Sequence, residues 1–115
     1  MASRFRVEWT DAASADLAEI ITFISRDSPL NAAKVYERIR KRANTLRTFP
    51  DRGHVVPELV ELDVVSYKEL SVPPYRILYR IEKSKVFVQA VLDGRRDLRQ
   101  LLSERLIRTP PYHRL

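Results

Sequence analysis

The sequence contains no cysteine, and only two glycines and two histidines occur among its 115 residues. The absence of cysteine excludes disulfide bonds, thiolate metal sites and a cysteine nucleophile. Gly53 and Gly94 stand alone, so they cannot form a glycine-rich phosphate loop, and the G-x-S-x-G pattern of a nucleophile elbow is missing. His54 and His113 lie far apart without a partner at metal-ligand spacing. We therefore expect no metal site and no cofactor.

Long hydrophobic runs are also missing. No apolar stretch approaches the ~20 residues of a membrane-spanning helix, and the N-terminal residues lack the apolar core of a signal peptide. The chain length predicts a single domain over residues 1–115. Its 44% hydrophobic and 31% charged residues are typical of a soluble globular protein. We expect a cytoplasmic protein without a membrane partner.

The net charge of +6 is concentrated in two segments. Residues 34–48 contain six basic side chains and one acidic one, and residues 94–115 contain six arginines and two acidic side chains. Such an excess indicates an anionic partner, which could be nucleic acid, an acidic protein or a membrane surface. A solvated basic surface without a partner is an equally simple interpretation.

Residue periodicity predicts the order strand, helix, helix, three strands, helix. Alternating Phe5, Val7 and Trp9 predict the first strand. Apolar residues spaced three and four apart predict one helix of about 15 residues capped by Thr10, and a second one between Ser28 and Phe49. We expect the buried stripe of the second helix to contain Ala32, Tyr36, Ile39, Ala43 and Leu46, and its solvated face to contain Lys34, Arg38 and Lys41.

The stretch from Tyr75 to Leu98 contains two strand patterns. Tyr75, Ile77, Tyr79 and Ile81 alternate with more polar residues, as in a half-buried strand. The next run, residues 86–92, is apolar on both faces and is expected inside the sheet. Residues 66–72 also alternate and are predicted to be a strand. Because short links join these three strands, we expect an antiparallel meander.

The remaining segments complete the expected architecture. Residues 51–65 show little periodicity and are predicted to be a long surface loop. A short C-terminal helix is predicted from Leu98, Leu101, Leu102 and Leu106. The predicted class is α+β, an antiparallel sheet in the order β-α-α-β-β-β with a two-helix hairpin packed on one face.

Four arginines near the second and third strands of this meander form the candidate site: Arg76, Arg80, Arg95 and Arg96. Forked guanidinium donors match phosphate and carboxylate, so this group could bind RNA and stabilise charge during phosphodiester cleavage. It could equally bind an acidic partner chain. The structural alternative is that the arginines pair with neighbouring acids of the sheet: Glu69, Glu82, Asp93 and Asp97. His54 is a weaker candidate acid or base because histidine titrates near neutrality.

Three segments, FPDRGHVVPEL, YKELSVPPYRILYRIE and VQAVLDGRRDL, occur in this order over nearly the whole chain. Together they resemble the RelE/ParE superfamily of toxins from bacterial type II toxin–antitoxin systems, which includes plasmid stabilisation proteins. The resemblance implies a compact sheet with two packed helices. It also implies a cognate antitoxin whose C-terminal segment wraps and neutralises the toxin, and hence a hetero-oligomer.

Within this superfamily, RelE-like toxins cleave mRNA on the ribosome, and ParE-like toxins inhibit DNA gyrase. The resemblance places the strand arginine of a RelE-like nuclease at Arg76 and its post-turn arginine at Arg96. It places the nuclease lysines at Tyr67 and Glu69 and the C-terminal tyrosine at Leu102. Because half of this set differs, we expect a growth-inhibiting toxin of the ParE-like, gyrase-inhibiting type. The alternatives are an mRNA endonuclease using Arg76 and Arg96, with Glu69 or His54 as further candidates, and a weak or inactive antitoxin-binding member.

Overall fold

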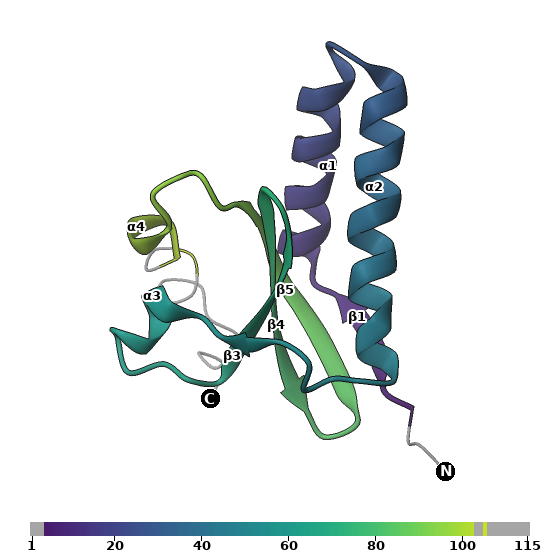
Figure 1. Cartoon of the computed structure of the whole chain (residues 1–115). Coiled ribbons are helices and arrows are strands. Elements are labelled where there is room, and N and C mark those ends of the chain that lie inside the picture. Colours follow the sequence, from purple (N-terminus) through teal and green to yellow (C-terminus); the bar gives the residue numbers. More distant parts are fainter. Residues whose placement is uncertain (1–3, 103–104, 106–115) are drawn as a thin grey trace.

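The computed structural model describes residues 4–102 and Arg105 (Figure 1). In chain order the elements are β1 (Arg6–Trp9), α1 (Asp11–Ser25), α2 (Pro29–Asn44), the 3-10 helix η1 (Thr45–Arg47), β2 (His54–Val55), α3 (Pro57–Val60), β3 (Tyr67–Val72), β4 (Tyr75–Glu82), β5 (Lys85–Asp93) and α4 (Leu98–Leu102). The predicted order is confirmed, with β2 and α3 as additional elements. Leu106 of the predicted C-terminal helix lies outside the described residues.

The sheet has the strand order β1-β5-β4-β3-β2. The antiparallel meander of β3, β4 and β5 is confirmed, and β2 adds to its edge in antiparallel fashion. At the other edge β1 runs parallel to β5, with Arg6 opposite Lys85 and Trp9 opposite Val88. The α+β class is therefore confirmed. The sheet is mixed and not wholly antiparallel as predicted, because β1 pairs in parallel with β5. Parallel strands need a long connection, and here the helical hairpin forms part of it.

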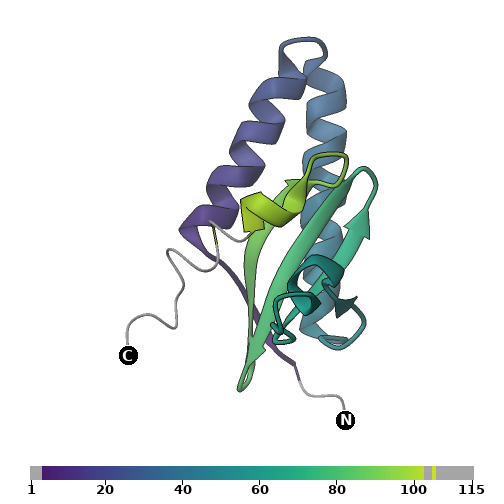
Figure 2. The same ribbon diagram turned by 90° about the vertical axis from the view of Figure 1, so that its left-hand side faces the viewer.

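The α1–α2 hairpin covers one face of the sheet, and α3 and α4 lie on the other (Figure 1). Figure 2 looks onto the face that α3 and α4 cover, with α2 behind the sheet. The predicted caps are confirmed, because Thr10 Oγ1 accepts from Ala13 N at 3.1 Å and Ser28 Oγ accepts from Asn31 N at 3.0 Å. No helix within the described residues is long and apolar enough to cross a membrane.

The buried face of α2 differs from prediction at one position. Val35 is buried, whereas Tyr36 is 41% exposed and lies with its ring 5.9 Å from the Arg40 guanidinium. At 100° per residue Val35 and Tyr36 lie on opposite margins of the Ala32–Ile39–Ala43 face, about 60° and 40° from its centre, so the helical period alone does not decide which of them is buried. The predicted role of Tyr36 in the core was therefore wrong. Aromatic side chains remain apolar at the margin of a helix face, so periodicity alone favoured it.

A β-bulge divides β5 between the two faces of the sheet. Leu78 pairs with Ala90, but the next residue, Tyr79, pairs with Val88. Val86 and Val88 consequently join the core beneath the helical hairpin, whereas Ala90 and Leu92 join the core beneath α3 and α4. Gln89 is the inserted residue, and Asp16 of α1 accepts a hydrogen bond from Val91 N just beyond it at 2.9 Å. A bulge lets one strand contribute apolar residues to both cores.

Residues 51–65 are not the plain surface loop that was predicted. Val56 and Leu59 are fully buried and pack with apolar residues from four other elements, β3, β4, β5 and α4. These partners are Tyr67, Leu78, Ala90, Leu92, Leu98 and Leu102. One turn of helix is too short to produce a periodic signal, which explains why the segment was misread. Its burial fixes α3 against the face of the sheet that contains Arg76.

Candidate functional site

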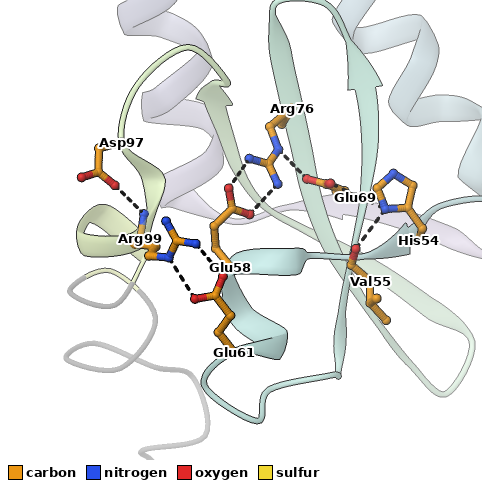
Figure 3. Close-up of polar contacts among 8 residues, drawn as sticks. All are labelled: His54, Val55, Glu58, Glu61, Glu69, Arg76, Asp97 and Arg99. Atoms are coloured by element: carbon orange, nitrogen blue, oxygen red, sulfur yellow. Dashed lines mark hydrogen bonds and ion pairs between the residues drawn. The ribbon is translucent and has the colours of Figure 1, made fainter.

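Arg76 lies at the centre of a cluster of three charged side chains, which we call the Arg76 cluster: Arg76, Glu58 and Glu69 (Figure 3). Arg76 extends from β4, Glu69 from the adjacent β3 and Glu58 from α3. The two Nη atoms of Arg76 donate to both Glu58 oxygens at 2.8 Å, and Nε donates to Glu69 Oε1 at 2.6 Å. All three side chains are largely buried, and Glu69 is only 8% exposed.

The electrostatics of this cluster strongly favour its ionised form. Hydrogen bonds from Arg76 hold the pKa of Glu58 below its usual value, although partial burial acts in the opposite direction. The pKa of Arg76 is raised, chiefly by its hydrogen bonds to Glu58. Burial of the guanidinium acts in the opposite direction, and the hydrogen bond to Glu69 raises the pKa further. Three of the five guanidinium donors are occupied. A phosphate entering here would have to displace two carboxylates.

A second arginine–glutamate pair connects α3 to α4. Arg99 donates to the two oxygens of Glu61 at 3.0 and 2.7 Å, and its backbone N donates to Asp97 Oδ1 at 3.2 Å (Figure 3). Both side chains of the pair are solvent-exposed, so the pair contributes little to stability. The pair adds a polar contact between the end of α3 and α4, whose Leu98 and Leu102 pack in the same core as Val56 and Leu59.

His54 lies at the edge of this region on β2. Its Nδ1 donates to the carbonyl of Val55 at 2.9 Å and lies 3.6 Å from Glu69 Oε2. The ring is mostly exposed, and Glu69 is already bonded to Arg76. The structure therefore brings two of the candidate residues near Arg76: Glu69 is a member of the Arg76 cluster, and His54 lies at its edge.

The other candidate arginines have separate surroundings. Arg80 pairs with Glu82 at 2.6 Å, and its guanidinium lies 4.5 Å from the centre of the Phe87 ring. Arg95 donates twice to Asp93, at 2.9 and 2.8 Å, and chiefly through this contact lowers the pKa of Asp93 to about 2. Three of the pairs expected from the structural alternative, those with Glu69, Glu82 and Asp93, are thus confirmed.

Arg96 differs from these three arginines. Its backbone N donates to the carbonyl of Asp93 at 3.1 Å, whereas its side chain is exposed and forms no ion pair within the described part of the chain. The four arginines do not meet around one central point. Arg76 is bonded on the α3 side of the sheet, whereas Arg95 and Arg96 contribute to a different feature.

That feature is a groove of about 880 Å³ between α1 and the turn that follows β5. Its walls include Phe23 and Ile24 from α1, Tyr75 from β4, and Arg95 and Arg96. Phe23 is 69% exposed and contributes an apolar surface to the groove. The charged residues of its lining are balanced, with three arginines and three acids: Arg26, Arg95, Arg96, Glu19, Asp27 and Asp93. Arg95 is bonded to Asp93, so Arg96 is the cation at this groove that could bind a carboxylate of an amphipathic peptide. Sequence reasoning missed the groove, although Phe23 lies off the apolar stripe of its helix and could have indicated it.

The positions that the resemblance assigned to a nuclease have mostly structural surroundings. Tyr67 and Leu102 are buried in the core beneath α3 and α4, and Glu69 is bonded to Arg76. No group of three or more acidic or histidine side chains among residues 4–102 and Arg105 could hold a metal ion. The two lysine positions are occupied by Tyr67 and Glu69, and the C-terminal tyrosine position is occupied by Leu102.

Comparison with known proteins identifies one family. The family described as "ParE toxin of type II toxin-antitoxin system, parDE" matches residues 7–98. Toxin RelE2 from Caulobacter vibrioides is 34% identical over 72% of this chain and 88% of its own length. Y4kP of Sinorhizobium fredii, a protein named as a toxin, is 32% identical over 87% of this chain and 99% of its own length.

Solved structures agree with these matches at the level of the fold. A chain of the chromosomal ParDE toxin–antitoxin system from P. aeruginosa superposes with a TM-score of 0.63 at 20% identity, covering 76% of this chain and 94% of that one. A chain of the toxin–antitoxin complex RelBE2 from Mycobacterium tuberculosis gives a TM-score of 0.52 at 23% identity, with 79% and 92% coverage.

Proposed function

This chain belongs to the ParE toxin family, within the RelE/ParE superfamily of type II toxin–antitoxin systems, and from this premise we propose that it stops growth by inhibiting DNA gyrase. In this proposal the toxin acts in the cytoplasm as a protein-binding inhibitor, without a cofactor. A cognate antitoxin neutralises it by forming a hetero-oligomer. The family membership accounts for the toxin and antitoxin roles; the choice of gyrase depends on the Arg76 cluster.

The state of Arg76 is the observation that supports gyrase over RNA cleavage. A nuclease of the RelE type needs a strand arginine that can bind a phosphate and stabilise developing charge. Here the Arg76 guanidinium is bonded to two glutamates. Two of the remaining positions, Tyr67 and Leu102, are core residues. An inhibitor that binds another protein has no need for any of these groups in a reactive arrangement.

One alternative retains specific support. The 34% identical relative is named Toxin RelE2, and Arg96 offers an exposed guanidinium without an ion pair in the described region. An mRNA endonuclease on the ribosome that uses Arg96, with other groups supplied by the ribosome, is therefore the second candidate function. A weak or inactive member that serves mainly to bind its antitoxin is the third.

Induction of the toxin in growing bacteria tests the choice of target. We expect growth arrest with gyrase–DNA adducts and a DNA-damage response, while transcripts remain intact by primer extension. Purified toxin should also inhibit supercoiling by gyrase in vitro. Co-expression of the antitoxin is the control and should restore growth. Rapid cleavage of transcripts at codon boundaries without DNA adducts would reject gyrase and support the nuclease.

We further propose that the groove containing Phe23, Arg95 and Arg96 receives the antitoxin. An acidic, amphipathic antitoxin segment would place apolar side chains against Phe23 and Ile24 and a carboxylate at Arg96, while Arg95 remains paired with Asp93 at the edge of the groove. Exposed apolar residues that line a groove commonly provide the anchors of an interface.

Replacing Phe23 with alanine should weaken antitoxin binding about tenfold or more, because truncating an aromatic anchor costs roughly 1–4 kcal/mol. The double variant R95Q/R96Q should mainly slow association and reduce the salt dependence of binding. Both effects can be measured by surface plasmon resonance. The matched controls are F49A, an exposed aromatic outside the groove, and R6Q/K85Q, which removes two cations elsewhere. Equal losses in the controls would place the antitoxin on another surface.

A further inference from the structure

The outer side of α2 contains a row of basic side chains that the toxin and antitoxin roles leave unexplained. We call Lys34, Arg38, Lys41 and Arg42 the α2 stripe. At 100° per residue these four side chains fall within about a 100° arc of the helix. Lys34, Arg38 and Lys41 are exposed, and Arg42 is half-buried. Glu37 is the single acidic residue of the helix, and it lies outside this arc.

Cations of the α2 stripe differ from those of the sheet in their partners. Arg76, Arg80 and Arg95 each pair with a carboxylate, as does Arg99 of α4. Within residues 4–102 and Arg105, no salt bridge involves a member of the α2 stripe. Arg38 donates only to the carbonyl of Pro73, at 3.4 Å. That contact leaves its charge uncompensated.

The stripe is also held rigidly and is separate from the groove. Another side of α2 is buried in the core through Ala32, Val35, Ile39 and Ala43, so the helix cannot turn. None of the four cations contributes to the wall of the groove. Their positive charges therefore form a cationic surface of fixed spacing that is separate from the groove.

We propose that the α2 stripe binds the phosphate backbone of duplex DNA. With a rise of 1.5 Å per residue, the row from Lys34 to Arg42 extends about 12 Å. Duplex DNA presents one negative charge per about 1.7 Å of axis, so several phosphates fall within this length. The stripe contains no aromatic side chain, which disfavours a protein partner, since protein interfaces centre on such anchors. Contacts to phosphates alone predict binding without sequence preference.

The choice of DNA over RNA rests on the proposed function, because gyrase acts on DNA. A toxin bound to gyrase would lie next to the DNA duplex, where a cationic stripe increases affinity by releasing counterions. The stripe thereby gives α2 a role in the target complex while the groove on α1 remains available to the antitoxin.

The test compares two variants of the full toxin with equal net charge. K34Q/R38Q/K41Q removes three cations of the stripe, and R6Q/K83Q/K85Q removes three cations at the far end of the β4–β5 hairpin and on β1. Binding is measured by fluorescence anisotropy with a labelled DNA duplex of about 20 base pairs at several salt concentrations. Thermal unfolding of each variant verifies that it is folded.

We expect the stripe variant to bind DNA about tenfold or more weakly at about 100 mM salt, with the salt slope reduced by about 3. The control should lose no more than about twofold. Equal losses in the two variants, or unchanged binding by the stripe variant, would overturn the inference. Stripe-dependent binding of duplex RNA or of polyglutamate in preference to DNA would also overturn it.

The DNA-binding test of the α2 stripe and the induction test of the target can fail independently of each other. If induction gives transcript cleavage while the stripe variant still loses DNA binding, gyrase is the wrong target and the DNA-binding surface remains. If gyrase adducts form while both variants bind DNA equally, only the inference about the stripe fails.

Discussion

Replacing Arg76 with methionine should lower the free energy of unfolding by about 2–4 kcal/mol. Methionine has a similar length but no charge, so Glu58 and Glu69 would face each other without a cation. Removing one partner of a buried ion pair is costly because the remaining charge stays desolvated. The expected loss is set somewhat below the range for fully buried pairs, since the Arg76 side chain is 17% exposed. Urea unfolding at neutral pH measures the change.

A triple variant separates stability from function. In R76M/E58M/E69M all three charges are replaced by apolar groups, and stability should return to within about 1 kcal/mol of the unmodified toxin. If Arg76 is structural, the folded triple variant should still arrest growth. If Arg76 binds the scissile phosphate of an RNA, the triple variant should be folded and harmless.

Arg80→Met is the matched control, because Arg80 lies on the same strand and face as Arg76. Its partner Glu82 is half exposed, and its guanidinium lies over the Phe87 ring, which methionine can also contact. We expect a loss of less than about 1 kcal/mol. An Arg76 variant no less stable than the Arg80 variant would show that the Arg76 cluster does not stabilise the fold. Loss of toxicity in a stable triple variant would reject our structural interpretation of Arg76.

Much of the fold was predictable from local patterns. Alternation predicted β3, β4 and the interior position of β5, and helical spacing with the caps Thr10 and Ser28 predicted α1 and α2. These elements are long enough for their periodicity to be read. The bulge at Gln89 was not predictable, because an uninterrupted apolar run looks the same whether or not its faces are exchanged in the middle.

The site was less predictable than the fold because its main contacts are long-range. The sequence suggested Glu69 as a partner of Arg76, since the two residues belong to adjacent strands. Glu58 was missed, although it forms both of the bonds to the Nη atoms. It reaches Arg76 only because Val56 and Leu59 are buried on the sheet, and that burial depends on α4 as well. Residues brought together by three elements leave no periodic signal in the chain.

A different close approach fixes the start of this segment on the sheet. Tyr79 is fully buried, and its hydroxyl donates to the carbonyl of Pro50 at 2.7 Å and accepts from Gly53 N at 3.0 Å. Burial raises the pKa of Tyr79, so the hydroxyl remains a donor at neutral pH. A Cβ atom on Gly53 would lie 2.5 Å from the carbonyl oxygen of Glu69 and 2.6 Å from Tyr79 Oη. The backbone oxygen cannot move away by a side-chain rotation.

Gly53→Ala should therefore lower the free energy of unfolding by about 2–3 kcal/mol, through overpacking and loss of the hydrogen bond to Tyr79. Tyr79→Phe should cost about 1–2 kcal/mol by leaving two partly buried backbone groups, Pro50 O and Gly53 N, without this partner. The control is Gly94→Ala, whose Cβ would lie 3.0 Å from Pro74 O and 3.1 Å from the flexible stem of Arg76, so a smaller loss of about 1 kcal/mol is expected. Chemical denaturation of the three variants gives the comparison.

Hydrogen exchange reports the same coupling locally. Because β2 and α3 follow Gly53 directly, the Gly53 variant should exchange the amides of Val56 and Leu59 faster than the Gly94 variant does. A Gly53 variant as stable and as protected as the Gly94 variant would mean that the turn adapts freely, and that α3 is positioned over Arg76 by its own buried side chains alone.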